Sequence, residues 1–257
     1  MTEEQELASQ ALEAGDASAL RRLLVEAPSL VEWLAGDPEG LAIELHRAAR
    51  ENHDGVVQVL LDLGADVNAR EGFHNWTPLH TAGWHGAPDA AEVLVARGAE
   101  LEARDVHDST PLFAATRPID KSGWAVVGLL LKSGAKLDLL SAIVLQQTHV
   151  VRALLLEQPD LLRTDPNGAD LLSVALEREN PGLARYLVER GADVNGCKHY
   201  SLPLIAAMTS VATYPFIEYL LAHGADPNLK PAPDQPSPLE WARETVPGVV
   251  PLLSAPS

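Results

Sequence analysis

The chain has 257 residues, of which 46% are hydrophobic and 21% are charged, a composition typical of a globular rather than a disordered protein. Its formal net charge is −17, and lysine and arginine are scattered along it, so binding to a nucleic-acid backbone is not expected. The sequence has no run of eighteen apolar residues, and a membrane span is therefore not expected either.

A short turn string recurs along the chain at a nearly fixed spacing. It begins as Gly-Ala-Asp-Val-Asn at residues 64–68, and related strings begin at Gly98, Gly134, Gly191 and Gly224. The steps between these glycines are 34, 36, 57 and 33 residues, and the long step leaves room for one shortened unit. A period in the thirties indicates stacked supersecondary units, each of which buries its apolar face against a neighbour.

A second string marks the expected start of a helix in each unit. Thr-Pro-Leu-His at 77–80 and Thr-Pro-Leu-Phe at 110–113 are 33 residues apart, and weaker copies begin at Ile43, Leu202 and Ser237. Threonine is a good N-cap because its hydroxyl accepts a hydrogen bond from a backbone amide of the first turn. Proline suits the first helical position because the N–H that it lacks would have no partner within the helix. Ser237 and Glu240 have the spacing of a capping box. At the other end of each unit, the glycine of the turn string supplies the left-handed residue that ends a helix.

These strings stay in register over nearly the whole chain and resemble the ankyrin repeat, whose unit reads D-x-x-G-x-TPLH-x-AA-x-x-G-H, then an apolar helix, then GADVNA. Residues 75–104 match this unit best. The resemblance implies an all-α solenoid of stacked antiparallel helix pairs with projecting hairpin-like fingers. We expect a single ankyrin-repeat domain over residues 1–257, with an N-terminal cap at about 1–37, six repeats over 38–228 and a C-terminal cap at 229–257.

Some segments depart from the repeat pattern. The chain passes from Asp138 almost directly into an apolar helix at Leu139, so the repeat near 139–164 is expected to be shortened and to lack a full finger. Residues 150–162 match residues 19–31 position for position, with proline in place of the glycine-alanine turn. Small insertions are expected at residues 117–123 and 211–215.

The resemblance also implies where a partner binds, because contacts in this family usually come from the finger tips and the exposed side of the first helix. In register with Thr77, and with Trp124 extending the patch from the inserted loop, the candidate residues are Phe73, His74, Trp76, Trp84, His85, His107, Arg117 and Trp124. Only 5% of the chain is aromatic, so this concentration of rings predicts a binding surface. The alternative is that Phe73 and Trp76 pack between adjacent fingers and that Trp84 covers a neighbouring helix.

The histidines do not predict a metal site. His46 and His80 stand where the family's histidine bonds neighbouring backbone, and we expect both to be structural. The spacing of His74, His80 and His85 does not place three ligands on one helical face. We therefore expect no bound metal and no cofactor.

Catalytic patterns are equally weak. Asp105, His107 and Ser109 contain the residue types of a nucleophilic triad, but side chains two apart on a finger cannot converge in that geometry. The sequence has no glycine-rich phosphate loop, and Cys197 has no nearby basic cluster that would lower the pKa of its thiol. An enzyme is not indicated.

The preferred function is a non-catalytic protein–protein interaction module. We expect a monomer. We also expect a cytoplasmic location, because the acidic start at residues 2–6 does not resemble a signal peptide and the single cysteine excludes an intramolecular disulfide. The net charge favours a partner with a basic surface, or else it serves solubility alone. The alternative function is a small-molecule or ion binder with a pocket near Trp124 and the shortened repeat at Leu139. Arginine outnumbers lysine by 14 to 5, which is consistent with a GC-rich bacterial genome.

Overall fold

The computed structural model describes residues 2–117, 123–165, 167–198, 201–209 and 213–254. Over these residues the chain is built from helices and contains no strand, although one isolated antiparallel bridge joins Glu71 and Trp76. The chain packs into two compact units, Met1–Leu137 and Asp138–Ser257.

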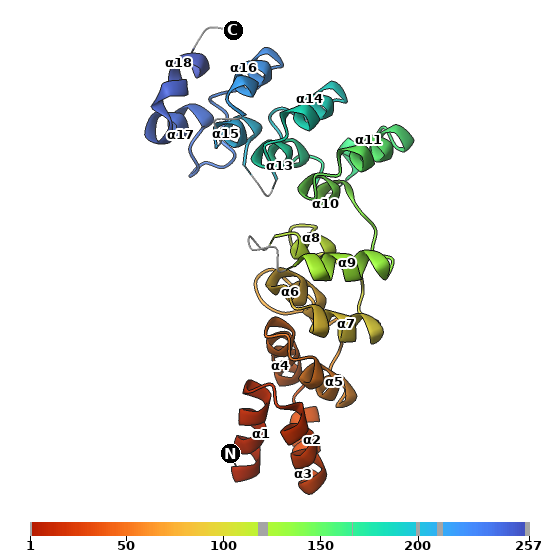
Figure 1. Ribbon diagram of the computed structural model, residues 1–257. Coiled ribbons are helices and arrows are strands. Elements are labelled where there is room, and N and C mark those ends of the chain that lie inside the picture. Colours follow the sequence, from red (N-terminus) through yellow and green to blue (C-terminus); the bar gives the residue numbers. More distant parts are fainter. Residues whose placement is uncertain (1, 118–122, 166, 199–200, 210–212, 255–257) are drawn as a thin grey trace. The chain divides into compact units, whose positions relative to one another are not determined.

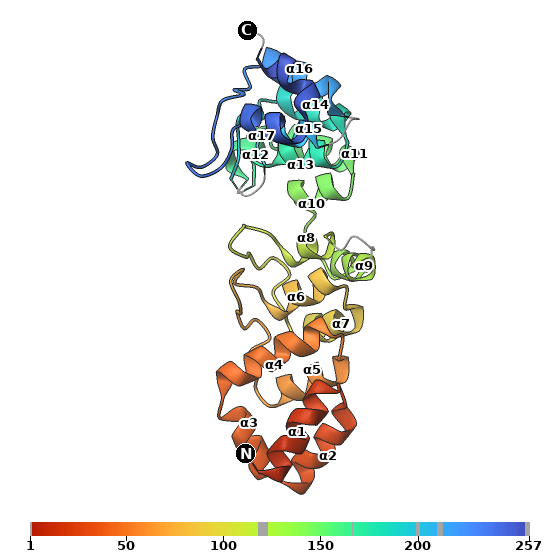
Figure 2. The same cartoon turned by 90° about the vertical axis from the view of Figure 1, so that its left-hand side faces the viewer.

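The first unit stacks helices in two rows (Figures 1 and 2). Helices α4, α6 and α8 pack side by side in an inner row, and α5, α7 and α9 form an outer row against them. Helices α1, α2 and α3 pack on one another, and α2 and α3 also contact the first pair, α5 and α4. The helices of this unit are α1 (Glu3–Glu13), α2 (Ala17–Glu26), α3 (Ser29–Ala35), α4 (Pro38–Arg50), α5 (Asp54–Asp62), α6 (Pro78–His85), α7 (Pro88–Ala96), α8 (Pro111–Ala115) and α9 (Trp124–Lys132).

The second unit repeats the same plan (Figure 1). Its inner helices pack in the order α10, α13, α15 and α17, and α11, α14 and α16 pair with the first three of them. Its helices are α10 (Leu139–Val144), α11 (Thr148–Glu157), α12 (Leu161–Thr164), α13 (Leu171–Glu177), α14 (Pro181–Glu189), α15 (Pro203–Met208), α16 (Pro215–Ala222), α17 (Pro238–Thr245) and α18 (Val250–Leu253), with a 3₁₀ turn at Pro247–Val249. Stacked helix pairs in both units confirm the predicted all-α fold class.

The predicted caps form at most of the expected helix starts. The Thr77 hydroxyl accepts the His80 amide at 3.4 Å, and the Thr110 hydroxyl accepts the Phe113 amide at 3.2 Å. Ser237 and Glu240 form the predicted capping box, with reciprocal bonds of 3.3 and 3.0 Å. Each of these side chains satisfies an amide that has no partner within its own helix.

The weak copy at Ile43 does not begin a helix. Helix α4 starts five residues earlier, where the Asp37 carboxylate accepts the Gly40 amide at 2.9 Å and Pro38 occupies the first helical position. An aspartate followed by proline is a stronger helix start than an isoleucine, which cannot cap. Ile43 therefore lies within α4.

The turn strings link successive units. Gly64 and Gly98 have φ angles of 98° and 86°, the left-handed conformation predicted for the residue that ends a unit. The Asn68 amide donates to the Asp66 carboxylate at 2.9 Å, and the Asn68 side chain accepts the amide of Glu100 in the following turn at 2.9 Å. The turn at Gly64 is thus hydrogen-bonded both within itself and to the turn that follows it.

Small residues let the inner helices approach closely. A Cβ atom at Gly83 in α6 would lie only 2.9 Å from the carbonyl oxygen of Pro111 and 3.1 Å from the amide nitrogen of Ala115 in α8. Leu79 and Leu112, at equivalent positions of these two helices, are fully buried beside this contact. A larger residue at Gly83 would separate two inner helices and the fingers that precede them.

The segment expected to form the shortened repeat begins directly with α10. The Asp138 carboxylate caps α10 directly by accepting the Ser141 amide at 2.7 Å. The predicted match between residues 19–31 and 150–162 is confirmed in backbone conformation. Ala27 has φ −129° and ψ 82°, and Gln158 has φ −131° and ψ 81°, so each leaves the helical region before a proline. Of the two predicted insertions, residues 118–122 and 211–212 lie outside the described residues.

Two repeats of the second unit carry a strained loop residue, Gln146 and Glu179, with φ angles of 55° and 54°. Gln146, between α10 and α11, is exposed and has a φ of 55°, whereas Asn52 and Gly86 occupy the same left-handed position in earlier repeats. A glutamine in this conformation costs about 1 kcal/mol that glycine does not.

Replacing Gln146 by glycine is therefore expected to raise the free energy of unfolding by about 0.5–1 kcal/mol. The neighbouring Gln147 has a negative φ of −82°, so Gln147→Gly serves as the control and is expected to lower it. Urea unfolding followed by circular dichroism measures both changes. Equal destabilisation by the two substitutions would show that the loop is not strained.

Candidate functional site

Six of the predicted binding residues form a continuous set of side-chain contacts in the first unit. We call this set the ring cluster: Phe73, His74, Trp76, Trp84, His107 and Arg117. The ring centroids of Trp84 and Trp76 are 5.2 Å apart, and those of Trp76 and His74 are 5.1 Å apart in a stacked arrangement. These distances are typical of favourable aromatic pairs.

The ring cluster extends beyond this central row at both ends. His74 contacts Phe73 and His107, with centroid distances of 5.6 and 5.4 Å. At the other end, the Arg117 guanidinium carbon lies 5.8 Å from the centre of the Trp84 ring, within cation–π distance. The cluster thus joins two fingers to the inner helix α6 and to the end of α8.

The backbone of the two fingers places these rings. In the first finger, the amide and carbonyl groups of Glu71 and Trp76 bond each other at 3.0 Å, and Asn75 takes the left-handed conformation with φ 54°. Asp108 takes the same conformation in the next finger, with φ 58°. The amide of Val106 donates to the carbonyl oxygen of His74 at 3.1 Å, so the fingers are bonded directly to each other.

Asp105 holds the rings and the second finger together. One of its carboxylate oxygens accepts the amides of His107 and Ser109 at 2.8 and 2.9 Å. The other accepts the indole N–H of Trp76 at 3.0 Å. The Asp105 carboxylate thus anchors a structural turn that contains His107 and Ser109.

His46 connects helix α4 to the finger that follows it, and His80 does the same for helix α6. The Nε2–H of His46 donates to the carbonyl of Ala69 at 3.0 Å, and the Nε2–H of His80 donates to the carbonyl of Ser109 at 3.1 Å. A carbonyl can only accept, so Nε2 carries the proton, and Nδ1 accepts from Thr81 in His46 and from Thr77 in His80. Burial lowers the pKa of both imidazoles, that of His80 to about 4. Their predicted structural role is confirmed.

Two arginines that were not predicted from the sequence brace the fingers. The Arg70 guanidinium donates to the carbonyls of Asn75 and Arg104 at 3.0 and 2.5 Å, and Arg104 donates to the carbonyl of Asp108 at 2.6 Å. A repeated Ala-Arg pair in the sequence could have identified them, because Arg70 and Arg104 follow alanine at the same position of successive repeats. Arginine satisfies several finger carbonyls at once through its fixed fork of N–H donors.

Exposure separates the residues of the ring cluster. Phe73 is 88% exposed and does not pack between fingers, whereas Trp76 is half-buried and bonded to Asp105. Trp84 is 39% exposed even with Trp76 and Arg117 beside it. The packing alternative thus describes Trp76, while Phe73 and Trp84 present large apolar surfaces that the fold leaves uncovered.

Two predicted binding residues stand apart from the ring cluster. His85 is the last residue of α6. Burial lowers the pKa of its imidazole, and the charge of Arg50 at the end of α4 lowers it further. Trp124 begins α9 and is 52% exposed, and among the described residues no ring contact joins it to the cluster. Leu139, named with Trp124 for the alternative small-molecule site, belongs to the second unit. Binding roles for these residues remain predictions.

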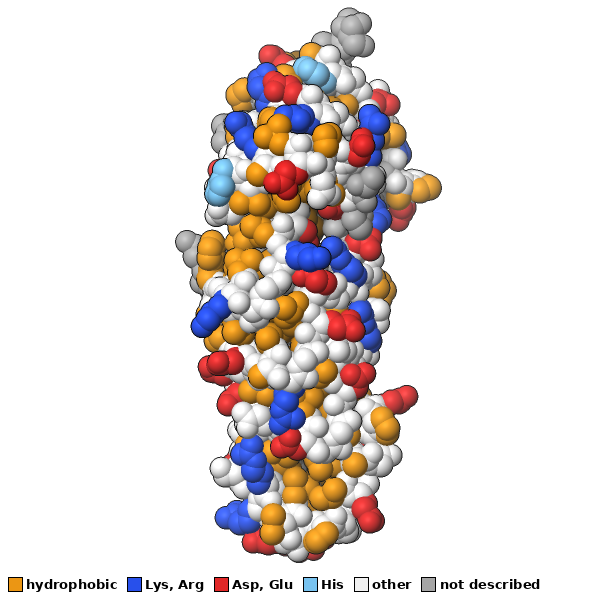
Figure 3. Space-filling model, turned by 90° about the vertical axis from the view of Figure 1, so that its right-hand side faces the viewer, with side chains coloured by type: hydrophobic (Ala, Val, Ile, Leu, Met, Phe, Trp, Pro, Cys, Tyr) orange, Lys and Arg blue, Asp and Glu red, His pale blue; other side chains and the backbone are white. Residues whose placement is uncertain are grey.

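The ring cluster lies in an electrically balanced part of an acidic unit. Residues 70–85 and 104–117 together contain three acidic and three basic side chains, whereas residues 1–137 contain 22 acidic and 11 basic ones. On the face presented by the outer helices α5, α7 and α9, hydrophobic side chains emerge between charges of both signs (Figure 3). The acidic excess of this unit therefore falls outside the two segments that carry the ring cluster.

The described part of the chain offers little for other kinds of site. It contains no group of three His, Cys, Asp or Glu side chains arranged to hold a metal ion. Burial, together with the charge of Asp170, raises the pKa of the Cys197 thiol, which opposes reactivity. None of the described helices has both the length and the apolar character needed to cross a membrane.

Comparison with known proteins agrees with this geometry. A family model described as ankyrin repeats (3 copies) matches residues 8–105, 45–141 and 139–231. The chain is 28% identical over 246 residues to "Ankyrin repeat and SOCS box protein 6" of Homo sapiens and of Pongo abelii, in an alignment that covers 81% of this chain and 58% of either relative. This chain thus spans little more than half the length of these relatives.

One further relative and one solved structure also match parts of this chain. The chain is 32% identical over 102 residues to the "E3 ubiquitin-protein ligase KEG" of Arabidopsis thaliana, covering 38% of this chain and 6% of that protein. Among solved structures, the human ASB11 ankyrin repeat domain is 25% identical and aligns with 83% of this chain and 98% of its own, with a TM-score of 0.43.

The histidine bonds predict how stability depends on pH. His80 has a folded pKa of about 4 against an ordinary value of 6.5, so between these pH values the unfolded chain binds a proton that the folded chain does not. The free energy of unfolding should therefore fall from pH 6.5 to 4, with His80 contributing up to about 3 kcal/mol of the loss.

The test compares wild type with His80→Gln by urea unfolding at several pH values. At pH 7 the variant should be less stable, because a glutamine does not reproduce the imidazole geometry that bonds Thr77 and the Ser109 carbonyl at once. The difference between the two proteins should narrow as the pH falls to 4. A difference that stays constant over this range would show that His80 titrates normally in the folded state.

Proposed function

Because the chain belongs to the ankyrin-repeat family, we propose that it is a protein–protein interaction module that binds its partner through the ring cluster. Ankyrin repeats generally mediate protein–protein interaction, and the fold is typically non-catalytic. The observation that supports this site is the unbroken series of contacts from Arg117 through Trp84, Trp76 and His74 to Phe73. Tryptophan and arginine are the residue types that contribute most to binding hot spots.

The cluster is held in place before any partner arrives. Asp105 fixes the Trp76 indole, and the Trp76 ring in turn supports Trp84 from one side while Arg117 lies over it from the other. Side chains ordered in the free protein lose little conformational entropy on binding, so more of the contact energy appears as affinity. Trp84 is therefore the proposed anchor, with Phe73 extending the contact along the finger.

The balance of charges around the cluster indicates what kind of surface it recognises. With three acidic and three basic residues in its two segments, it gives no net attraction to a highly charged partner. The proposed partner surface is apolar at its centre, with hydrogen-bonding groups that face His74, His107 and Arg117. Affinity at this site should consequently change little with ionic strength.

Replacing Trp84 by alanine is expected to weaken binding of the partner by about 2 kcal/mol, which is about 30-fold in Kd. Because Trp84 is already 39% exposed, the melting temperature should change by only a few degrees. The partner is first recovered from native lysate with the wild-type chain, and its affinity for each variant is then measured by titration calorimetry.

Leu131→Ala is the control, since Leu131 is also 39% exposed but lies on the outer helix α9. It should leave partner affinity unchanged. Trp124→Ala shows whether Trp124 extends the surface. If Trp84→Ala instead lowers the melting temperature steeply and leaves affinity intact, Trp84 is a packing residue and the proposed site is wrong.

A further inference from the structure

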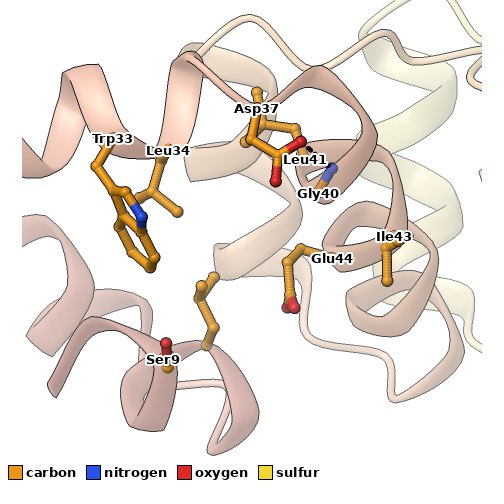
Figure 4. Close-up of a pocket in the computed structure, with 9 residues that line it drawn as sticks. Ser9, Trp33, Leu34, Asp37, Gly40, Leu41, Ile43 and Glu44 are labelled. Carbon is orange, nitrogen blue, oxygen red and sulfur yellow. Dashed lines mark hydrogen bonds between the residues drawn. The ribbon is translucent and has the colours of Figure 1, made fainter. Parts of the chain in front are cut away.

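The first unit has a cleft of about 260 Å³ far from the ring cluster in sequence, among helices α1, α3 and α4. Figure 4 shows Trp33 and Leu34 of α3 on one side, Glu44 of α4 on the other and Ser9 of α1 below them. The lining residues are Ser9, Leu12, Trp33, Leu34, Asp37, Gly40, Leu41, Ile43 and Glu44. We call this feature the cap cleft.

The wall of the cap cleft is apolar and only partly covered. Leu12, Leu34 and Leu41 are buried beneath it, whereas Trp33 and Ile43 remain 36% and 52% exposed. Neither residue is required to fill the core of the unit. The cleft therefore offers apolar surface that a large hydrophobic side chain could cover.

Two carboxylates border this apolar wall. Asp37 uses one oxygen to cap α4 at Gly40, and Glu44 pairs with Arg47 on the next turn. Burial raises the pKa of Glu44 even with Arg47 beside it, so its charge is incompletely compensated. A further cation placed in the cleft would improve its environment.

The chain around the cap cleft carries the strongest acidic excess of the unit. Residues 1–44 contain ten Asp and Glu but only two Lys and Arg. Three of the acids, Glu3, Glu4 and Glu6, lie in the first turn of α1. This contrasts with the balanced charge at the ring cluster and makes the cap cleft the place where a basic partner is attracted.

The size of the cleft indicates a protein side chain rather than a metabolite. Pockets that enclose small molecules usually measure about 300–1,000 Å³, and the cap cleft at about 260 Å³ falls below that range. Its volume suits one or two large side chains of a docked segment. Between helices, the segment that presents such side chains most readily is an amphipathic helix.

We propose that the cap cleft binds a basic amphipathic segment of a partner protein, which inserts a large apolar side chain between Trp33 and Ile43 and places lysine or arginine against Asp37 and Glu44. This site goes beyond the proposed function, because it uses none of the residues of the ring cluster. A second copy of this chain is a poor occupant, since each copy carries a net charge of −17.

The probe is a fluorescein-labelled helical peptide of about 16 residues, some four helical turns, with tryptophan and leucine on one face and lysine on the other. Fluorescence anisotropy should show that it binds the full chain and that Ile43→Ser weakens binding by about tenfold, the loss expected for one buried aliphatic side chain. Glu44→Gln should weaken binding several-fold at low salt and less at high salt.

Matched controls separate this site from general attraction to an acidic protein. Val25→Ser removes an apolar side chain that is 80% exposed on α2 and does not line the cleft, and it should leave binding unchanged. A peptide with alanine in place of tryptophan and leucine keeps the charge and should bind at least about tenfold more weakly. Circular dichroism and melting of each variant confirm that the fold is intact.

Several results would overturn the proposal. Equal affinity of Ile43→Ser and wild type would remove the cleft as the site, and equal affinity of the alanine peptide would leave only charge attraction. Tight binding of a glutamate version of the peptide would exclude a basic occupant. Sedimentation that shows a wild-type dimer and an Ile43→Ser monomer would assign the cleft to a second copy. Trp84→Ala should not change peptide binding, so this proposal and the one for the ring cluster fail independently.

Discussion

The bond from a neutral histidine to the next finger is the interaction on which the first unit depends. His46 and His80 each donate Nε2–H to a carbonyl in the finger that follows their helix. Without these donors, the Ala69 carbonyl would lose its bond to His46 and the Ser109 carbonyl would keep only the Asp105 amide, so the fingers would be held less firmly. Four residues of the ring cluster lie on those fingers, namely Phe73, His74, Trp76 and His107. Its geometry is therefore a consequence of two side chains that lie outside the proposed binding surface.

The first unit separates its two candidate surfaces by charge. The ring cluster combines aromatic rings with balanced charges, whereas the cap cleft combines an apolar wall with an acidic surround. Long-range attraction depends on net local charge, and short-range affinity depends on buried apolar area. A partner with a basic segment would meet the cap cleft first. The net charge of −17 thus bears on binding at the cap cleft and says little about binding at the ring cluster.

Much of the fold and of the ring cluster could be predicted because the repeat spacing relates positions in adjacent units. Thr77, Thr110 and the left-handed glycines behave as that register requires. His85 did not follow Trp84 into the cluster, because consecutive residues on a helix point about 100° apart. Two features were not predictable from periodicity: the start of α4 at Pro38, five residues before Ile43, and the cap cleft. Both arise where the Asp37–Pro38 start and the packing of α1 and α3 replace the regular unit.

The arrangement of bonds determines which residues can report on binding alone. Trp76 donates to Asp105, and the same carboxylate accepts two amides of the second finger, so changing Trp76 or Asp105 disturbs folding and recognition together. Phe73 and Trp84 take no part in these hydrogen bonds and retain large exposed areas. Energetic effects of groups that share partners are not additive, whereas those of separate groups nearly are. The ring cluster therefore has a structural part around Trp76, and its exposed residues Phe73 and Trp84 are those to which we assign the proposed recognition role.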